Sequence, residues 1–319
     1  MTEPGRKVVV TVPATTANLG PGFDTLGLAL ALYDTLEVTV RDEPGLVIDV
    51  TGMGADAVPR DERHLVYRAI AHTFASVGRA VPPLHLRAHN VIPHGRGLGS
   101  SAAAIVSGIV AAQGLLAADV SLTEEDLLGL ATELEGHPDN VAPALFGGLT
   151  IAWTTPDGPR HKKLLVHRGV SPLVLVPGHE MSTELARSLQ PQSVPHEDAV
   201  FNVSRSALLV AALTQSPELL LAATEDKLHQ NYRAEAMPET SRLIALLRAA
   251  GYPAVVSGAG PSILVLATDP SHRAAATELV AAETQGDPWQ ALPLAVDFLG
   301  CTWSDSASEP ARLHTHRMG

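Results

Sequence analysis

The sequence predicts a two-domain protein of the α+β class. Its 319 residues exceed the length at which one hydrophobic core usually stops growing. Runs with an apolar residue at every second position, typical of strands, occur together with runs of helical period in both halves. The polar stretch "TTPDGPRHKK" is the best candidate for a linker. We therefore expect domains at residues 1–158 and 159–305, with a boundary near residues 155–163 and a polar tail at 306–319.

The first half should begin with strands. The β-branched run "KVVVTVPA" predicts one strand, and "LGLALALYDTLEVTV" predicts either one long strand or two short ones. "LVIDVTG" and "LHLRAHN" are two further candidates, and residues 64–77 between them have helical period. A glycine-rich loop follows, and then a helix that should begin near Ser100.

A capped helix is predicted in "SLTEEDLLGLATELEG". Ser121 or Thr123 can cap its start, and the acidic residues 124–126 lie at the positive end of the helix dipole. Gly136 and Pro138 are typical of its end. The stretch "FGGLTIAW" then predicts a strand that closes at Trp153.

The second half should contain four strands after the linker and four helices. "SPLVLVPG" predicts the first strand, and helical patterns cover about residues 198–213, 217–230 and 238–250. "YPAVVSGAGPSILVLAT" predicts two strands joined by a tight glycine turn, with a helix from about Pro270 and a last strand near "PLAVDFLG". The polar end "SDSASEPARLHTHRMG" should be disordered.

Composition excludes several classes of protein. The net charge of −12 repels polyanions and argues against nucleic acid or an anionic membrane as partner. The single cysteine excludes a disulfide framework, and no signal-peptide pattern opens the chain, so a cytoplasmic location is expected. The 14 histidines are scattered without metal-binding spacing. Residues 101–118 are too rich in Ala, Gly and Ser for a membrane span and instead predict a buried helix.

The loop in "IPHGRGLGSSAA" could bind a phosphate. It matches neither common phosphate motif, because Ser100 replaces the third glycine of G-x-G-x-x-G and no lysine follows Gly99. However, Gly95, Gly97 and Gly99 allow a close approach of the backbone, and a helix start near Ser100 offers free N–H groups and a positive dipole end. The alternative is a plain glycine turn capped by Ser100.

Three further stretches decide between these alternatives. They are the polar loop in "PATTANLGPGFDTLGLAL", the helix end in "EGHPDNVAPALFGG" and the glycine turn "SGAGPS". Together with the glycine loop, they resemble the signatures of the GHMP kinases, in the same order and over essentially the whole chain. The resemblance implies an N-terminal domain like domain 2 of ribosomal protein S5, a ferredoxin-like C-terminal domain, an active site in the cleft between them, and a homodimer.

The resemblance implies ATP and Mg²⁺ as cofactors. One hydroxyl of the serine pair, with Ser101 preferred, would bind Mg²⁺ together with Glu135, whereas Glu133 is the alternative carboxylate. Hydroxyl and carboxylate oxygens are the hard ligands that Mg²⁺ prefers. The ATP triphosphate would be wrapped by one continuous segment, namely Pro93, His94, Gly95, Arg96, Gly97, Leu98, Gly99, Ser100, Ser101, Ala102 and Ala103.

The chain departs from part of the family at the position of the general base. In the mevalonate and galactose kinases, an aspartate serves as base seven residues before a glycine pair. The same count back from Gly147 gives Asn140, and an amide cannot accept a proton. Catalysis would then come from positioning and charge neutralisation without a protein base. Asp139, one residue away, remains the alternative.

Within the family, the four stretches are most similar to members that phosphorylate the side-chain hydroxyl of L-homoserine. By resemblance, Arg187 and Arg233 would bind the substrate carboxylate. The amino and hydroxyl ends would contact Asn18, Asp24, His137 and Asn140, and the catalytic residues would be Ser101, Glu135, Asn140 and Asp24.

The expected activity is ATP-dependent formation of O-phospho-L-homoserine for threonine biosynthesis. The alternatives are a kinase of the same fold for another small alcohol, such as threonine or mevalonate, and a non-catalytic sensor of the same fold. A nicotinamide-dependent oxidoreductase is a distant third, because Ser100 replaces the third glycine.

Overall fold

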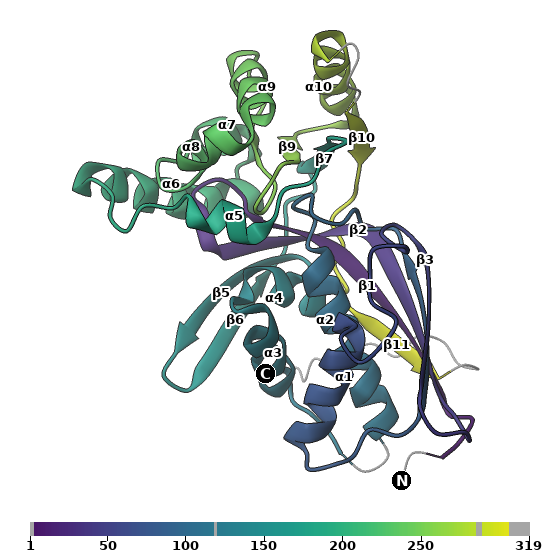
Figure 1. The fold of residues 1–319 in the computed structure, drawn as a ribbon. Helices are drawn as coiled ribbons and strands as arrows, with labels where there is room; N and C mark the ends of the chain where they lie inside the picture. The colour runs from purple at the N-terminus through teal and green to yellow at the C-terminus, as the bar shows by residue number, and fades with distance from the viewer. Residues whose placement is uncertain (1–2, 118–119, 285–288, 306–319) are drawn as a thin grey trace.

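The computed structural model describes residues 3–117, 120–284 and 289–305, and it contains two sheets (Figure 1). The first sheet has β1 (Lys7–Asn18) and β2 (Gly22–Val40) at its centre, with β2 as a single long strand. Next to β2 lies β4 (Leu84–Asn90), and β3 (Leu46–Gly52) pairs with β4 in parallel at the edge of the sheet. The sequence left one or two strands open for β2, and the structure has one.

The other strands of this sheet come from distant parts of the chain. The amino-terminal end of β2 pairs with β5 (Leu149–Thr155), which forms a hairpin with β6 (Gly158–Leu164). The final strand β11 (Thr302–Asp305) returns from the second half and pairs with β1. The first sheet therefore includes residues from both ends of the chain.

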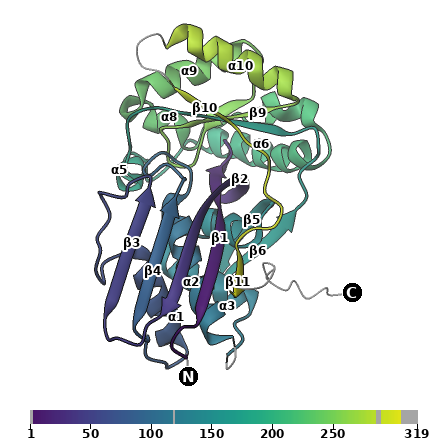
Figure 2. The ribbon, with the colours of Figure 1, turned by 90° about the vertical axis from the view of Figure 1, so that its right-hand side faces the viewer.

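Four helices cover one face of the first sheet. They are α1 (Leu65–Ser76), α2 (Ser100–Leu116), α3 (Glu124–Glu135) and α4 (Pro138–Phe146), and Figure 2 shows them behind the strands. The uncharged α2 is almost entirely buried between the sheet and α1, where its small residues allow close packing. Thr123, not Ser121, caps α3, and Gly136 ends it in a left-handed conformation.

The second sheet has four antiparallel strands in the order β10 (Gln290–Pro293), β7 (Ser171–Val176), β9 (Ile263–Ala267) and β8 (Ala254–Val256). The helices α9 (Pro238–Ala249) and α10 (Pro270–Glu283) pack against it. The long helix α6 (His196–Thr214) and the short helices α5 (Thr183–Ser188), α7 (Leu220–Ala223) and α8 (Gln230–Arg233) lie to the left of the second sheet in Figure 1.

The structure corrects several sequence predictions. The predicted linker at residues 154–163 is wrong, because these polar residues form the β5–β6 hairpin of the first sheet. The predicted helix at 217–230 is broken into a short 3₁₀ turn, α7 and a loop before α8. The predicted strand near "PLAVDFLG" is also wrong, because β10 ends at Pro293 and β11 begins at Thr302.

Two helices were not predicted, and two predictions on domain organisation stay open. The missed helices are α4 and α5. The domain ranges 1–158 and 159–305 stay a prediction, although β6 and β11 both belong to the first sheet. The polar tail at 306–319 lies outside the described residues. In the part of the chain that the structure describes, no helix has the length and apolar character needed to cross a membrane.

Candidate active site

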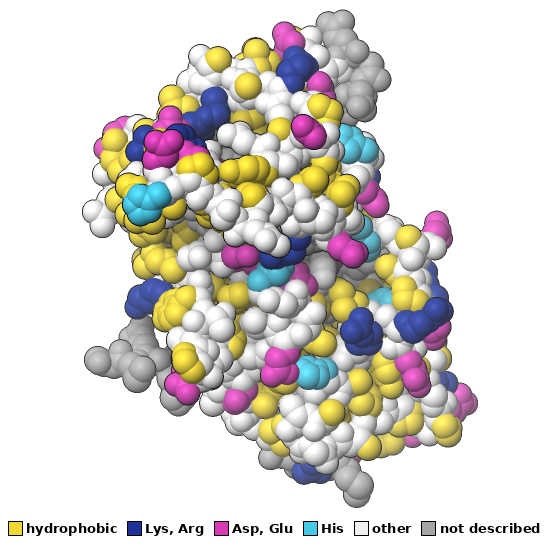
Figure 3. All heavy atoms as spheres, turned by 60° about the vertical axis from the view of Figure 1, so that its left-hand side comes forward, with side chains coloured by type: hydrophobic (Ala, Val, Ile, Leu, Met, Phe, Trp, Pro, Cys, Tyr) yellow, Lys and Arg dark blue, Asp and Glu magenta, His cyan; other side chains and the backbone are white. Residues whose placement is uncertain are grey.

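A cleft between the two halves collects the predicted catalytic and substrate-binding side chains. Figure 3 shows acidic, basic and histidine side chains together in the hollow at the middle of this face. The first half lines the cleft with its glycine loop, the loop after β1 and the α3–α4 junction, and the second half with α5, α8 and the turn after β8. The predicted residues that line it are Asn18, Asp24, Ser101, Glu135, His137, Asn140, Arg187 and Arg233.

The glycine loop has the backbone shape that an anion site needs. Gly95, Gly97 and Gly99 have φ angles of 61°, 70° and 69°, a region that other residues adopt only with strain. Gly99 is also the residue before α2, and it has no side chain to accept the first N–H groups of the helix. These N–H groups and the helix dipole therefore point into the cleft at Ser100 and Ser101.

The loop is fixed in place by the second half of the chain. The Ser257 hydroxyl donates to the Gly97 carbonyl over 2.7 Å, and a Cβ at Gly97 would overlap the Ser257 carbonyl. The Met181 N–H donates to the Gly95 carbonyl over 2.9 Å. Arg96 forms an ion pair of 3.1 Å with Glu180. The loop therefore has the close backbone contacts that its glycines predict.

Not every residue of the predicted phosphate segment faces the cleft. Leu98 and Ala102 are buried beneath the loop, and Pro93 lies in a separate shallow pocket. His94 and Ala103 face a neighbouring apolar pocket, which shares Ser100 and Ser101 with the cleft.

Ser101 and Glu135 meet at the helix ends. The Ser101 hydroxyl donates to Glu135 Oε2 over 2.8 Å, between the start of α2 and the end of α3. Burial raises the pKa of Glu135, although the Ser101 hydrogen bond and the nearby His137 oppose this shift. Glu133, by contrast, is exposed, lies outside the cleft and pairs with His72 over 2.8 Å.

The start of α4 brings a histidine–aspartate pair and Asn140 into the cleft. His137 Nδ1 is hydrogen bonded to the buried carboxylate of Asp139. Burial disfavours the charged imidazole, but the hydrogen bond and charge of Asp139 outweigh burial, so the pKa of His137 is raised. The Asp139 carboxylate is thus already hydrogen bonded to His137. The next residue, Asn140, lines the cleft together with the glycine loop.

Thr15 is a residue near the site that the sequence did not single out. Its hydroxyl, fully buried on β1, donates to Asn140 Oδ1 over 3.0 Å. Asn140 Oδ1 therefore faces Thr15, and the Asn140 Nδ2 group is directed away from it. The quoted stretch "PATTANLG" contains Thr15, but the pairing spans 125 residues, and no local pattern indicates it.

Asn18 at the end of β1 and Asp24 near the start of β2 are in strained conformations, and we call the segment 18–24 the strained loop. Both residues have positive φ angles, of 70° and 52°. Asn18 Oδ1 accepts the Asp24 N–H over 3.0 Å, and its Nδ2 donates to the Gly258 carbonyl over 2.9 Å. The Asp24 carboxylate forms an ion pair with Arg187 over 2.9 Å. Backbone strain that persists in this way is typical of functional sites.

Arg233 is a buried cation without an anionic partner among the contacts described. It is 2% exposed, its Nη1 donates weakly to the Gly258 carbonyl over 3.3 Å, and its Nε has no partner in the described residues. Burial and the nearby Arg187 charge lower the pKa of Arg233 to about 10. A buried, unpaired guanidinium at the wall of a cleft is suited to bind a carboxylate.

The apolar pocket beside the cleft was not assigned from the sequence. It lies between β1, β2, α1 and α2, and the polar side chains in its lining are Asp34, Thr35, Arg63, His64, Asn90, His94, Ser100, Ser101 and Ser107. The aliphatic side chains in its lining are Val12, Leu36, Val58, Pro59, Leu65, Val66, Ala88, Ala103 and Ala104. These residues are spread over strands and loops, so no single stretch of the sequence indicates the pocket.

Comparisons with known proteins agree with this geometry. Residues 64–148 match the family model for the GHMP kinases N terminal domain, and residues 208–283 match the model for GHMP kinases C terminal. A homoserine kinase of Clavibacter michiganensis subsp. michiganensis is 71% identical over 96% of this chain and 98% of its own length. One from Streptomyces avermitilis is 51% identical over 92% of this chain and 95% of its own.

Solved structures give the same result for the fold. A homoserine kinase from Cytophaga hutchinsonii has a TM-score of 0.84 at 27% identity, over 93% of this chain and 97% of its own. A mevalonate diphosphate decarboxylase from Staphylococcus aureus has a TM-score of 0.68 at 14% identity over 94% of this chain and 98% of its own, which indicates a shared fold alone. The predicted two-domain α+β fold is thus confirmed. The chain belongs to the GHMP kinase family, and its relatives named above include homoserine kinases.

Proposed function

We propose that this protein transfers the γ-phosphoryl group of ATP to the side-chain hydroxyl of L-homoserine, which forms O-phospho-L-homoserine for threonine biosynthesis. The observation that carries the substrate assignment is the pair of opposite charges at one end of the cleft, where Arg233 has no anionic partner and Asp24 faces the cleft. A carboxylate near Arg233 and an ammonium near Asp24 are the two charges of an α-amino acid. The high identity to homoserine kinases supports the same substrate.

ATP would occupy the two adjoining pockets. The triphosphate would lie against the glycine loop and the start of α2, where N–H groups replace the lysine of other phosphate loops. Adenine would occupy the apolar pocket, which meets the cleft at Ser100 and Ser101. The substrate hydroxyl would then approach the γ-phosphate from the side of Asn140.

Ser101 and Glu135 are the residues that would hold Mg²⁺. Their oxygen atoms are hard ligands 2.8 Å apart. A nearby cation would also favour the ionised form of Glu135, which burial alone disfavours. When bound, the metal ion supplies positive charge that neutralises the phosphate oxygens during transfer.

Asn140 would orient the acceptor hydroxyl rather than deprotonate it. Thr15 holds Oδ1, so Nδ2 would donate to the substrate hydroxyl oxygen. That oxygen forms the new bond to the γ-phosphorus as the bond to the β,γ-bridging oxygen breaks, and its proton leaves to a phosphate oxygen or to water. The hydrogen bond between His137 and Asp139 supports this reading, because it leaves Asp139 poorly placed as a base.

Changing Thr15 to valine is expected to lower kcat by about tenfold with little change in the KM for ATP. The substitution keeps the side-chain shape but removes one donor, worth about 1 kcal/mol or more when an acceptor is left unpaired. Steady-state kinetics with both substrates varied measure the effect. Thr73→Val is the matched control, because Thr73 is equally buried but bonds only within α1. Equal kinetic effects of both variants would contradict the role given to Thr15.

An assay of ADP release tests the function directly. L-Homoserine, L-threonine, L-serine and mevalonate are compared as acceptors with ATP and magnesium. We expect homoserine to give the highest kcat/KM and mevalonate, which has no ammonium for Asp24, the lowest. Turnover with another alcohol but not homoserine would favour the alternative kinase, and no turnover with any of them would favour a sensor.

Two further expectations accompany this function. A cytoplasmic location follows from the threonine biosynthetic role, and a homodimer from the family resemblance. Size-exclusion chromatography with light scattering measures the second.

A further inference from the structure

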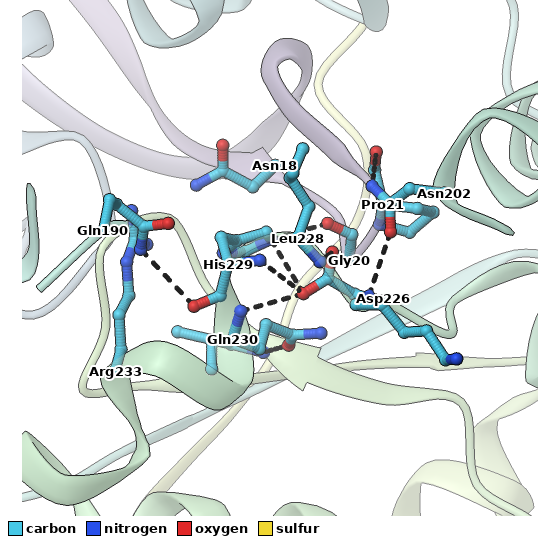
Figure 4. A network of polar contacts seen from close by, with 12 residues as sticks. Asn18, Gly20, Pro21, Gln190, Asn202, Asp226, Leu228, His229, Gln230 and Arg233 are labelled. Atoms are coloured by element: carbon cyan, nitrogen blue, oxygen red, sulfur yellow. Dashed lines mark hydrogen bonds and ion pairs between the residues drawn. The ribbon is translucent and has the colours of Figure 1, made fainter. Parts of the chain in front are cut away.

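His229 lies at the junction of the two halves, outside the cleft. Its side chain is fully buried, and its Nε2 is 2.7 Å from the carbonyl oxygen of Gly20 (Figure 4). Burial lowers the pKa of His229, which favours a neutral ring near neutral pH. Because the Gly20 carbonyl can only accept, the single ring proton is on Nε2. His229 therefore donates one buried hydrogen bond across the junction.

The loop that receives this bond is strained. At the turn from β1 into β2, Asn18, Leu19, Gly20 and Asp24 all have φ angles between 49° and 87°. Such a loop keeps its shape only when its surroundings fix it. Its backbone also lies against the second half so closely that a Cβ at Gly20 would be 2.7 Å from the Thr224 carbonyl oxygen.

The His229 ring also contacts the side chain that precedes Asp24. It stacks on Phe23 with a centroid distance of 4.9 Å and an interplanar angle of 22°. The Arg233 guanidinium lies 5.3 Å from the centroid of the same Phe23 ring. His229 thus touches the strained loop at Gly20 and Phe23, between Asn18 and Asp24 in the sequence.

The backbone of His229 connects to the two arginines. Its N–H is accepted by Asp226 Oδ2 over 3.1 Å, in the turn that begins α8, the helix that contains Arg233. Its carbonyl accepts the Gln190 side chain over 3.4 Å, and the Gln190 N–H donates to the Arg187 carbonyl over 3.1 Å. Figure 4 shows Gln190, His229 and the Gly20 carbonyl as parts of one network.

We propose that His229 is a positioning residue for the amino-acid acceptor, which sets the strained loop with Asn18 and Asp24 at the correct distance from Arg187 and Arg233. The proposal rests on the proposed function, since it concerns how the same site recognises homoserine. None of the His229 contacts described above is with the glycine loop or the apolar pocket. Loss of the His229 bond should therefore weaken homoserine binding and spare ATP binding.

Three substitutions at position 229 test the proposal. His229→Phe keeps a ring for Phe23 but removes the donor, and His229→Asn places an amide too far from Gly20. His229→Gln places its amide nitrogen close to the native Nε2 position. We expect the Phe and Asn variants to raise the homoserine KM by about 10- to 100-fold, with the ATP KM within about twofold of wild type. The Gln variant should stay within about threefold of wild type for both.

Ser206→Ala is the matched control. Ser206 also donates to a carbonyl of this loop, at Pro21, but Asn202 donates to the same oxygen and can retain it. Its homoserine KM should therefore remain within about twofold of wild type. If His229→Phe fails to fold, the homoserine KM values of His229→Asn and His229→Gln alone test the proposal.

The results that overturn the proposal are distinct from failure of the proposed function. Wild-type protein without homoserine turnover would refute the function itself. Active wild type with unchanged homoserine KM in the Phe and Asn variants would refute the role of His229. Equal increases in the KM values for homoserine and ATP would mean that His229 only supports the fold, and would refute the proposal. A homoserine KM of His229→Gln as high as that of His229→Asn would refute it as well.

Discussion

Replacement of Glu135 by glutamine is expected to lower kcat by about 10²- to 10³-fold while the fold is retained. Glutamine has nearly the same shape and can still accept the Ser101 hydroxyl, which now donates over 2.8 Å. The substitution removes the one negative charge that Glu135 would offer to Mg²⁺. Steady-state kinetics over a range of magnesium concentrations measure the loss, and high magnesium should restore little of it.

The same variant should not lose thermal stability without metal. Burial raises the pKa of Glu135 above its ordinary value of 4.5, so the protonated form is favoured in the folded state. The stabilisation from that proton is complete below about pH 4.5 and is lost as the pH rises through the folded-state pKa. Glutamine is neutral at every pH. The Tm of the metal-free variant should therefore equal or exceed that of wild type near neutral pH, and this advantage should shrink in acid.

Glu133→Gln is the control for this experiment. Glu133 is on the same helix but is exposed and pairs with His72 outside the cleft. Its replacement should leave kcat within about twofold of wild type. If Glu133→Gln instead abolishes turnover and Glu135→Gln does not, the proposed magnesium ligand is wrong.

The glycine loop and α2 were predictable from the sequence because their constraints are local. Three glycines at alternating positions permit the positive φ angles of Gly95, Gly97 and Gly99. The uncharged run after Ser100 can only form a buried helix, and the structure has it at α2. The strands β1 to β5 and β7 to β9 followed from equally local patterns of apolar residues, whereas β6, β10 and β11 did not.

Other parts of the fold were missed because local signals were misleading. Gly136 and Pro138 correctly mark the end of α3, but Pro138 is also the first residue of α4, where proline is well tolerated. Pro143 inside α4 also argued against a helix, because proline is unfavourable in a helix interior. The polar β5–β6 hairpin was mistaken for a linker because β6 is only partly buried and has few apolar residues.

The network that supports the cleft depends on contacts between distant residues. Thr15 meets Asn140 across 125 positions, and His229 meets Gly20 across 209. Each of these side chains is an ordinary buried polar residue when only its neighbours in the sequence are considered. The family signatures therefore predicted which residues line the cleft, whereas the residues that hold them there required the three-dimensional structure.

Replacement of Arg233 by leucine is expected to raise the homoserine KM by about 10- to 150-fold, with the ATP KM almost unchanged. The proposed charged hydrogen bond to the carboxylate is worth about 1.5–3 kcal/mol. The variant should fold well, because burial already lowers the pKa of Arg233 to about 10 and so opposes its charge. The Gly258 carbonyl would also keep its 2.9 Å bond from Asn18. Arg205→Leu, which removes an arginine outside the cleft, is the control.

A substrate analogue without the carboxylate tests whether the effect of Arg233→Leu depends on that group. 3-Aminopropan-1-ol is homoserine with the carboxylate replaced by hydrogen, so it retains the ammonium for Asp24 and the hydroxyl for Asn140. If Arg233 binds the carboxylate, the inhibition constant of this analogue should change by less than about twofold between wild type and Arg233→Leu. An equal loss of affinity for homoserine and for the analogue in Arg233→Leu would mean that Arg233 acts through the shape of the site. A higher ATP KM with unchanged homoserine KM would instead place Arg233 at the nucleotide, because its charge would then be matched by phosphate.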